Sequence, residues 1–247
     1  MARSGARPPR APLNRERILR AAIELADEDG IEALTMRRLG HRLGVEAMSL
    51  YNHVKDKDDI LDGVVELIAA QFEVPTGAPD WKTSIRSSAI SVHEVLYQHP
   101  WASSVIESRA RAGPARLRLL DALLGVLAGA GFQMPIVIRT LVALDSHTYG
   151  FTLQEQAWAL PADEASDRAG ALADDLPADT YVNVEAMLGF VKTIRPGTLV
   201  DFEFGLDLLL EGLQRRLATG LARPIGPPAR ASVVPAGLVL TMARYQP

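Results

Sequence analysis

The chain has 247 residues, 48% of them hydrophobic and 23% charged, which is typical of a globular protein with one large domain or two small ones. It has no cysteine, so disulfides and thiolate metal sites are excluded. No run of about 18 apolar residues predicts a transmembrane helix, and the basic N-terminus lacks the apolar region of a secretory signal. We therefore expect a cytoplasmic protein with no membrane partner.

The charge is unevenly distributed along the chain, whose net charge is −4. Residues 1–57 carry 11 Lys and Arg against 8 Asp and Glu, whereas the remaining residues carry 15 against 22. A weakly basic head on an acidic body suits a protein that meets DNA with one end only.

The first 60 residues predict a compact group of helices. Residues 1–13 are rich in Pro and Arg and are expected to be a disordered basic arm, although an arm that touches phosphates or a minor groove remains an alternative. Asn14 is the expected N-cap of a helix that ends at Asp29-Gly30. Asp56 is the expected cap of a longer helix from Lys57 to about Phe72.

Between these helices, Thr35–Val54 predicts a helix-turn-helix. Thr35 caps a helix over residues 36–43, Gly44 ends it, and a second short helix runs from about Glu46 to His53. Leu39, Leu43, Val45 and Leu50 are spaced to share one small core. The side chains left outside that core are Arg37, Arg38, Arg42, Glu46, Met48, Ser49, Tyr51, Asn52, His53, Lys55 and Lys57. Cations and polar tips around a short helix are what a DNA major groove requires.

The body of the chain also predicts helices and no strands. Turn and cap residues place these helices at residues 81–98, 100–108, 115–130, 136–160 and 182–193, and from Thr198 or Asp201 to 219. Residues 161–180 lack an apolar period and predict a long mobile loop. The last helix is apolar on more than one face, so a monomer would leave too much of it exposed.

We therefore predict an all-α protein of about nine or ten helices. Its predicted parts are a three-helix helix-turn-helix DNA-binding domain at residues 14–58 and a helical ligand-binding and dimerisation domain at 59–220. Residues 221–247 are a tail to which we assign no structure.

Four segments resemble one known family. The stretch ILRAAIELADEDGIEALTMRRLGHRLGVEAMSLYNHVKDKDDILDGV resembles the DNA-binding domain of the tetracycline-repressor (TetR) family. HPWASSVIESRARAGPARLRLLDALLGVLAGAGF, YGFTLQEQ and FEFGLDLLLEGLQ are similar to the ligand-binding and dimerisation domain of the tetracycline repressors themselves. The resemblance spans residues 15–217 and implies a homodimer, in which the eighth and last helices of each subunit form a four-helix bundle.

The resemblance also implies a set of DNA contacts. Thr35 and Arg37 match positions that contact the DNA backbone or bases. Glu46, Met48 and Ser49 match positions that face bases. Tyr51, His53 and Lys57 match positions that contact phosphates. Ala47 and Asn52 complete the predicted set. Ala47 replaces a base-reading glutamine and Met48 replaces a proline of the tetracycline repressors, so their operator sequence does not transfer to this chain.

The body departs further from the tetracycline repressors, which hold a magnesium–tetracycline chelate with His, Asn and Glu side chains. The matching positions here are Glu73, Ser88, Val92, Ile106 and Gln154. Tetracycline–magnesium is therefore not the expected effector, and we expect no cofactor and no metal. Candidates to line a pocket for a small apolar or amphipathic effector are Val92, His93, Leu96, Trp101, Val105, Leu120, Leu124, Leu141, Leu144, Asp145, His147, Thr148 and Phe151.

No catalytic site is predicted. The chain lacks P-loop, GxGxxG, GxSxG and HExxH motifs, and its five histidines are not at metal-ligand spacing. Each is expected to be a lone surface or core histidine, with His147 the best pocket candidate. The stretch Glu66–Glu73 and the acidic loop 161–180 could suggest paired carboxylates, but they lack an orienting partner, so we expect solvated charge runs.

These observations favour a ligand-responsive transcriptional repressor. A dimer would place two recognition helices in successive major grooves of a palindromic double-stranded operator. A small-molecule effector would release it, with the helix from Lys57 to Phe72 as the lever. Two alternatives stay open, an all-α enzyme that uses the body pocket and a helical adaptor that uses the helix-turn-helix for protein contacts.

Overall fold

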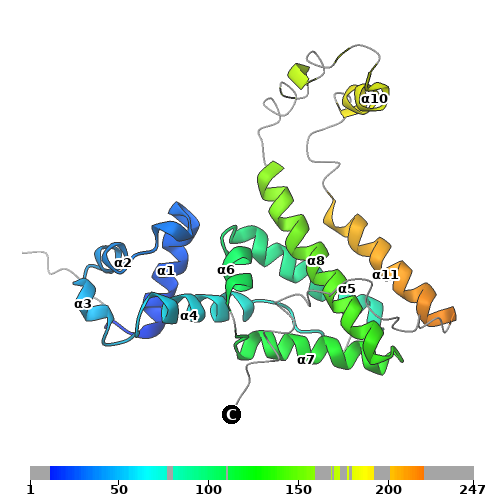
Figure 1. The fold of residues 1–247 in the computed structure, drawn as a ribbon. Helices are drawn as coiled ribbons and strands as arrows, with labels where there is room; N and C mark the ends of the chain where they lie inside the picture. The colour runs from blue at the N-terminus through cyan, green and yellow to red at the C-terminus, as the bar shows by residue number, and fades with distance from the viewer. Residues whose placement is uncertain are drawn as a thin grey trace, which may run out of the picture. The chain divides into compact units, whose positions relative to one another are not determined.

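The structure is a computed structural model that describes residues 12–76, 80–109, 111–158, 168, 170–172, 177, 180–191 and 201–219. Within these residues every regular element is a helix and no strand occurs (Figure 1), as the all-α prediction requires. The predicted tail and most of the predicted arm lie outside the described residues. Most of the predicted loop at 161–180 does too, but residues 170–172 of it are helical.

Contacts divide the chain into two compact units. The head unit contains residues 12–72 together with the described residues of 99–120, and the body unit contains the described residues of 73–98 and those from Asp121 onward. The helix α7 (Pro114–Gly129) therefore begins in the head unit and ends in the body unit. The head unit is thus built from two separate stretches of sequence.

The N-terminal stretch of the head unit has the predicted helices. They are α1 (Arg15–Asp29), α2 (Met36–Leu43), α3 (Ala47–Leu50) and α4 (Lys57–Ala69), with a 3-10 turn η1 (Ile31–Ala33) after α1. The three predicted N-caps are confirmed. Asn14 Oδ1 accepts the Arg17 N–H at 2.8 Å, Thr35 Oγ1 accepts the Arg38 N–H at 3.2 Å, and Asp56 Oδ1 accepts the Asp59 N–H at 2.8 Å. Each cap satisfies an N–H that has no partner inside its helix.

The predicted turn between α2 and α3 is also confirmed. Gly44 has φ 67° and ψ 40°, the left-handed conformation that glycine adopts without steric cost. The second helix is shorter than predicted, because α3 ends at Leu50 and residues 51–53 form a turn. In that turn the His53 N–H donates to the Leu50 carbonyl at 2.9 Å.

A single apolar core holds these helices together. Ile18, Leu39, Leu50 and Ile60 are fully buried, whereas Val45 is only half-buried. Burial of each such side chain contributes about 1.5–3 kcal/mol. The two helices of the helix-turn-helix are therefore fixed to α1 and α4 rather than free to move alone.

The helix α6 (Ala102–Ser108) returns to this core. Asp27, in the last turn of α1, accepts the Trp101 indole N–H at 2.7 Å and lies 2.8 Å from His99 Nδ1. The helix starts two residues after Pro100, where the sequence predicted a start at Pro100 itself. Trp101 is buried, so this junction ties the start of α6 to α1.

The segment that follows α6 holds α4 along its length. Arg109 Nη1 lies 3.0 Å from an Asp58 oxygen and 3.3 Å from an Asp62 oxygen, and the Ala115 N–H at the start of α7 donates to Glu66 Oε1 at 2.7 Å. The three acidic residues are spaced by four, so they lie on one face of α4. The prediction that Glu66 is solvated was wrong, because a helix start 49 residues away supplies its partner.

The body unit has α5 (Trp81–Gln98), α8 (Met134–Trp158), α10 (Val182–Val191) and α11 (Phe202–Thr219), close to the predicted ranges. The helices α5, α8 and α11 pack against one another (Figure 1). Arg86 of α5 forms ion pairs with Glu203 and Asp207 of α11, which joins helices that are far apart in sequence.

Candidate DNA-binding interface and effector site

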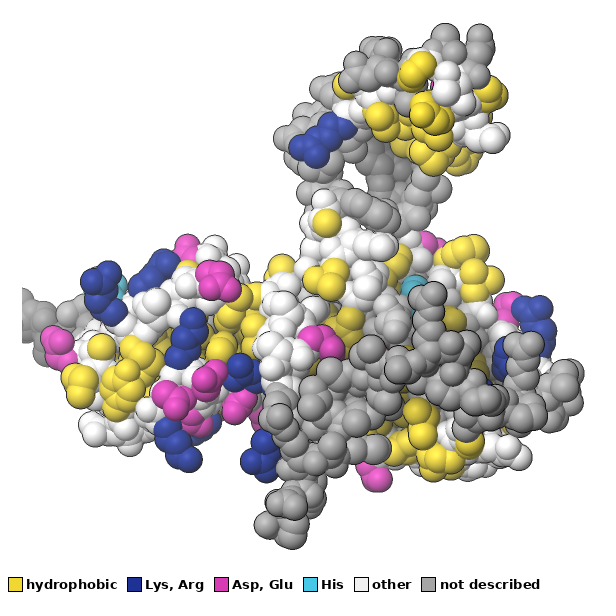
Figure 2. Space-filling view, in the orientation of Figure 1, with side chains coloured by type: hydrophobic (Ala, Val, Ile, Leu, Met, Phe, Trp, Pro, Cys, Tyr) yellow, Lys and Arg dark blue, Asp and Glu magenta, His cyan; other side chains and the backbone are white. Residues whose placement is uncertain are grey.

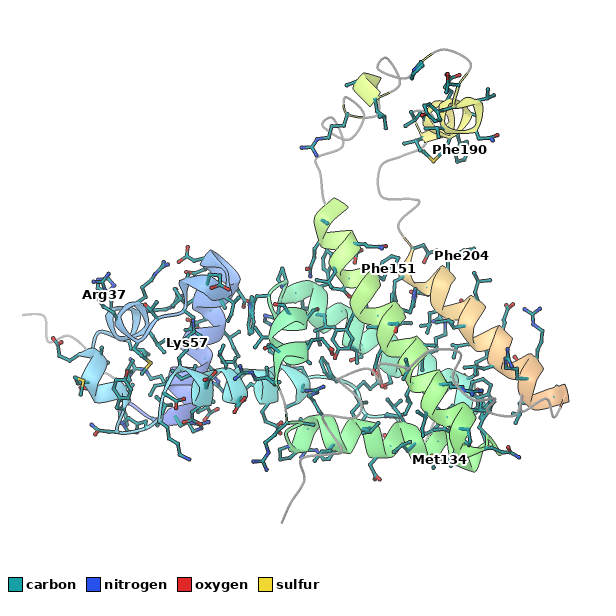
Figure 3. All side chains as sticks on the ribbon, viewed as in Figure 1. Arg37, Lys57, Met134, Phe151, Phe190 and Phe204 are labelled. Carbon is teal, nitrogen blue, oxygen red and sulfur yellow. The ribbon has the colours of Figure 1, made fainter. Side chains whose placement is uncertain are left out.

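The head unit presents most of the predicted DNA-binding side chains to solvent. They come from α2, α3, the turn after α3 and the start of α4, as the positions of Arg37 and Lys57 show in Figure 3. The exposed members are Thr35, Arg37, Glu46, Met48, Tyr51, Asn52, His53 and Lys57, whereas Ala47 and Ser49 are half-buried.

The exposed cations of this region divide into two groups. Arg37, Lys55 and Lys57 have no carboxylate within 4.0 Å among the described residues. In contrast, Arg38 lies 2.5 Å from Asp29, and Arg42 is held by two carboxylates of α1. Only the first group is available for phosphates without the loss of an existing ion pair.

Arg42 acts as a brace between α2 and α1. Its guanidinium donates to both oxygens of Glu28 at 2.6 Å and to Glu24 at 3.3 Å. Hydrogen bonds from Arg42 lower the pKa of Glu28, and those same bonds raise the pKa of Arg42. The sequence placed Arg42 outside the core but did not show that its charge is already paired.

The helix α3 is positioned by close backbone packing on α2. A Cβ on Gly40 would lie 2.9 Å from the Val45 carbonyl oxygen and 3.2 Å from the Ala47 nitrogen. Ala47 therefore sits against α2. The next residue, Met48, is 74% exposed and is the first side chain of α3 that reaches away from the unit.

The start of α4 is fixed by a charged contact that the sequence did not predict. Asp59 accepts two hydrogen bonds from Arg15 of α1, both at 2.8 Å, and the Lys55 N–H at 2.9 Å. These bonds hold the pKa of Asp59 below its usual range, and the hydrogen bond from Arg15 contributes more than the one from the Lys55 N–H. The contact orders the short segment that carries Lys55 and Lys57.

The predicted effector residues divide between the two units. Trp101, Val105 and Leu120 belong to the head unit, and the others belong to the body unit. In the body unit Leu96, Leu141, Leu144 and Thr148 are buried, Val92 and Leu124 are half-buried, and Asp145 is exposed.

Three of the predicted effector residues gather in one aromatic cluster of the body unit. Their common partner is Phe202, the first residue of α11. The imidazole of His93 stacks on the Phe202 ring at 4.1 Å between centroids, and that of His147 stacks on it at 4.9 Å. Phe151, which Figure 3 labels on α8, lies 5.5 Å from Phe202.

Polar contacts fix the two imidazoles of this cluster. His93 Nε2 lies 2.8 Å from Glu155 Oε2, and His147 Nε2–H donates to the Phe202 carbonyl at 2.9 Å. Gly205 leaves space for the second ring, since a Cβ there would lie 3.0 Å from His147 Nε2. Sequence reasoning missed Phe202 and Glu155, because no local pattern relates the start of α11 to α5 and α8.

The described residues form neither a metal site nor a membrane-spanning helix. No group of three or more His, Asp or Glu side chains among them is arranged to hold a metal ion. None of the helices they form is long and apolar enough to cross a membrane.

Known proteins share both parts of this architecture. The family described as "Bacterial regulatory proteins, tetR family" matches residues 18–64, and "Tetracyclin repressor-like, C-terminal domain" matches residues 75–217. An HTH-type transcriptional regulator of Saccharopolyspora erythraea is 36% identical over 81% of this chain and 84% of its own length. The class C tetracycline repressor of Escherichia coli is 31% identical over 84% and 94%.

A solved structure has the same fold. Apo ActR from Streptomyces coelicolor superimposes with a TM-score of 0.70 over 85% of this chain and 99% of its own, at 24% identity. The ActR protein is also known in complex with actinorhodin.

Proposed function

Because the chain belongs to the tetracycline-repressor family of transcriptional regulators, we propose that α3 docks in the major groove of its operator and that the aromatic cluster receives its effector. Family members bind DNA operators and small-molecule ligands and are regulators rather than enzymes. This chain is accordingly a ligand-responsive DNA-binding regulator and not an enzyme. A regulator of this kind would act in the cytoplasm, where bacterial DNA lies.

One observation carries the proposed DNA contact. The face formed by α2, α3 and the start of α4 has three exposed cations without ion-pair partners among the described residues, together with the polar tips of Tyr51 and Asn52. Cations of this kind position a protein on phosphates, as does the Tyr51 hydroxyl, and the Asn52 amide can hydrogen-bond to DNA as well. The remaining cations of the helix-turn-helix, Arg38 and Arg42, hold it in shape.

We propose a homodimer that buries the outer face of α11. Phe204 and Leu208 of α11, spaced by four, are 66% and 54% exposed. Beside them a groove of about 400 Å³ runs between α8 and α11, lined by Thr140, Leu144 and Leu213 among others. A second copy that covers this face would pair the head units on two half-sites about 34–36 Å apart.

The aromatic cluster supports an aromatic or amphipathic effector. The two imidazoles and the Phe151 ring are half-buried around the buried Phe202 ring, so an aromatic effector could stack on them, and His93 with Glu155 offers a polar pair. Tetracycline repressors are relatives of this chain, and ActR, which is known in complex with actinorhodin, shares its fold. The effector would favour a state in which the two head units are spaced differently. The coupling free energy between effector binding and DNA binding would be about 1–3 kcal/mol, and α4 would transmit the change to the head unit.

A gel shift with duplexes that flank the chain's own gene tests the DNA contact. Tyr51→Ala should weaken binding to specific and random DNA alike, because it removes a phosphate contact. Ser49→Ala should change sequence preference instead, because Ser49 matches a base-facing position. Absence of any shift at low salt would contradict the proposal, and equal losses by both variants would contradict the assigned roles.

Neither alternative is supported by an observation. An enzyme would need a convergent acid, base and nucleophile, and the family consists of regulators. An adaptor would not need the unpaired cations around α3.

A further inference from the structure

The exposed face of α3 is apolar at its tip. Among residues 12–72, the large apolar side chains that are exposed are Met48, at 74%, and Tyr51, at 46%. They are three residues apart and so share one face. Figure 2 shows apolar atoms at the end of the head unit that carries α3.

Met48 gains nothing from this position in the free protein. Its thioether is at most a weak hydrogen-bond acceptor, so it cannot read the polar edge of a base. Its side chain gains free energy only when an apolar group covers it. If α3 docks on a partner, that partner could supply the apolar group.

The surroundings of Met48 favour DNA over an apolar protein surface as the covering partner. Arg37, Lys55 and Lys57 are exposed and lack ion-pair partners among the described residues, which complements phosphates. An apolar protein partner would instead require a larger apolar surface than Met48 and Tyr51 supply.

The neighbours of Met48 cannot take its place. Ala47 packs against Gly40, and Ser49 is half-buried. Met48 is thus the side chain of α3 that enters the groove first if the helix docks as proposed.

The one apolar feature of the major groove is the C5 methyl group of thymine. We propose that Met48 contacts that methyl group and so specifies an A·T pair in each half-site of the operator. The inference rests on the proposed function, since it requires α3 to lie in the major groove. It adds the chemistry of one base position, which the family resemblance leaves open.

Deoxyuridine separates contacts to the thymine methyl group from hydrogen bonds to the base, and the Met48 variants then identify the residue that makes the contact. It keeps the hydrogen-bond donors and acceptors of thymine and lacks only the methyl group. The full chain would first select its preferred duplex from a random-sequence pool. Each thymine of the selected site would then be replaced by deoxyuridine, and binding would be measured for the wild type, Met48→Ala and Met48→Leu.

At one or two thymines in each half-site, uracil should weaken wild-type binding about fourfold. This is the change in Kd that corresponds to the burial of one carbon group. Met48→Ala should lose that sensitivity and Met48→Leu should keep it. Met134→Ala is the matched control, because Met134 is a 52% exposed methionine of the body unit. Its uracil sensitivity should equal that of the wild type.

Two different failures can be told apart. If a site is selected but Met48→Ala shows the same uracil sensitivity as the wild type at every thymine, this inference is overturned and the proposed function is not. A pool from which no sequence is enriched would overturn the proposed function, and the inference with it.

Discussion

At the scale of single residues, charge has two separate uses in the head unit. Arg15, Arg38 and Arg42 are paired with carboxylates that lie 9 to 44 residues away in sequence. Arg37, Lys55 and Lys57 have no such partner among the described residues. The paired group joins helices, and the unpaired group is the one that we propose for phosphate contacts. Composition alone counts both groups as basic and so overstates the charge that DNA can meet.

Asp59 gives a pH-dependent test of the paired group. The pKa of Asp59 is lower in the folded protein than in the unfolded chain, so the ionised carboxylate stabilises the fold. This contribution is fully present above the unfolded pKa of about 3.9 and is lost as the pH falls toward the folded pKa. Asp59→Asn should lower the free energy of unfolding by about 1 kcal/mol at pH 7. Urea denaturation from pH 7 to pH 3 should show the difference from wild type narrowing below about pH 4.

Glu16→Gln is the control for this measurement, because Glu16 pairs with Arg20 on the exposed surface of one helix. It should change stability little at any pH. A gap between Asp59→Asn and the wild type that stayed constant down to pH 3 would show that the Asp59 charge does not stabilise the fold.

At the scale of elements, the helices were predictable and their partners were not. Asn14, Thr35 and Asp56 cap helices through bonds to residues three positions away, so a short window of sequence contains the whole interaction. The aromatic cluster brings Phe202 of α11 to His93 of α5. Its geometry depends on how helices pack, which no local period encodes. His93, His147 and Phe151 of the cluster were predicted from residue type and helix position, and Phe202 was not.

The contact between α2 and α3 is the element-scale test. Gly40→Ala would place a Cβ 2.9 Å from the Val45 carbonyl oxygen, so the α3 backbone must shift. We expect a loss of about 1–3 kcal/mol in stability and a large loss of specific DNA binding, measured by thermal unfolding and gel shift.

Gly125→Ala is the matched control. Gly125 lies inside α7 with no heavy atom within 4 Å of an added Cβ, so the change should raise stability by about 0.5–1 kcal/mol. DNA binding by Gly40→Ala at the wild-type level would mean that α3 tolerates movement on α2 and that Gly40 does not set its position.

At the scale of the whole molecule, the proposed homodimer makes the outer face of α11 the surface that would let two heads meet DNA together. A face with Phe204 and Leu208 more than half exposed is costly to leave in water. Two copies that share this face would bind both half-sites of a palindrome as one unit. Once one head unit is bound, the effective concentration of the other at the second half-site is high.

Phe204→Glu should therefore convert the dimer to a monomer, because it buries a charge in the proposed interface. Sedimentation would measure the mass, and binding to a full palindrome should fall to the level of a single half-site. Leu117→Glu, which changes an exposed leucine of α7, should leave both unchanged. A Phe204→Glu protein that sediments as a dimer would exclude this face as the interface.

The two-part construction of the head unit has a practical consequence for exchanging such heads between regulators. The acidic face of α4 finds its partners, Arg109 and Ala115, only after the chain has passed through α5. A chimera joined at one point behind α4 would carry those carboxylates without their cation and without the helix start they cap. The exchangeable module is a discontinuous one, residues 12–72 grafted together with 99–120.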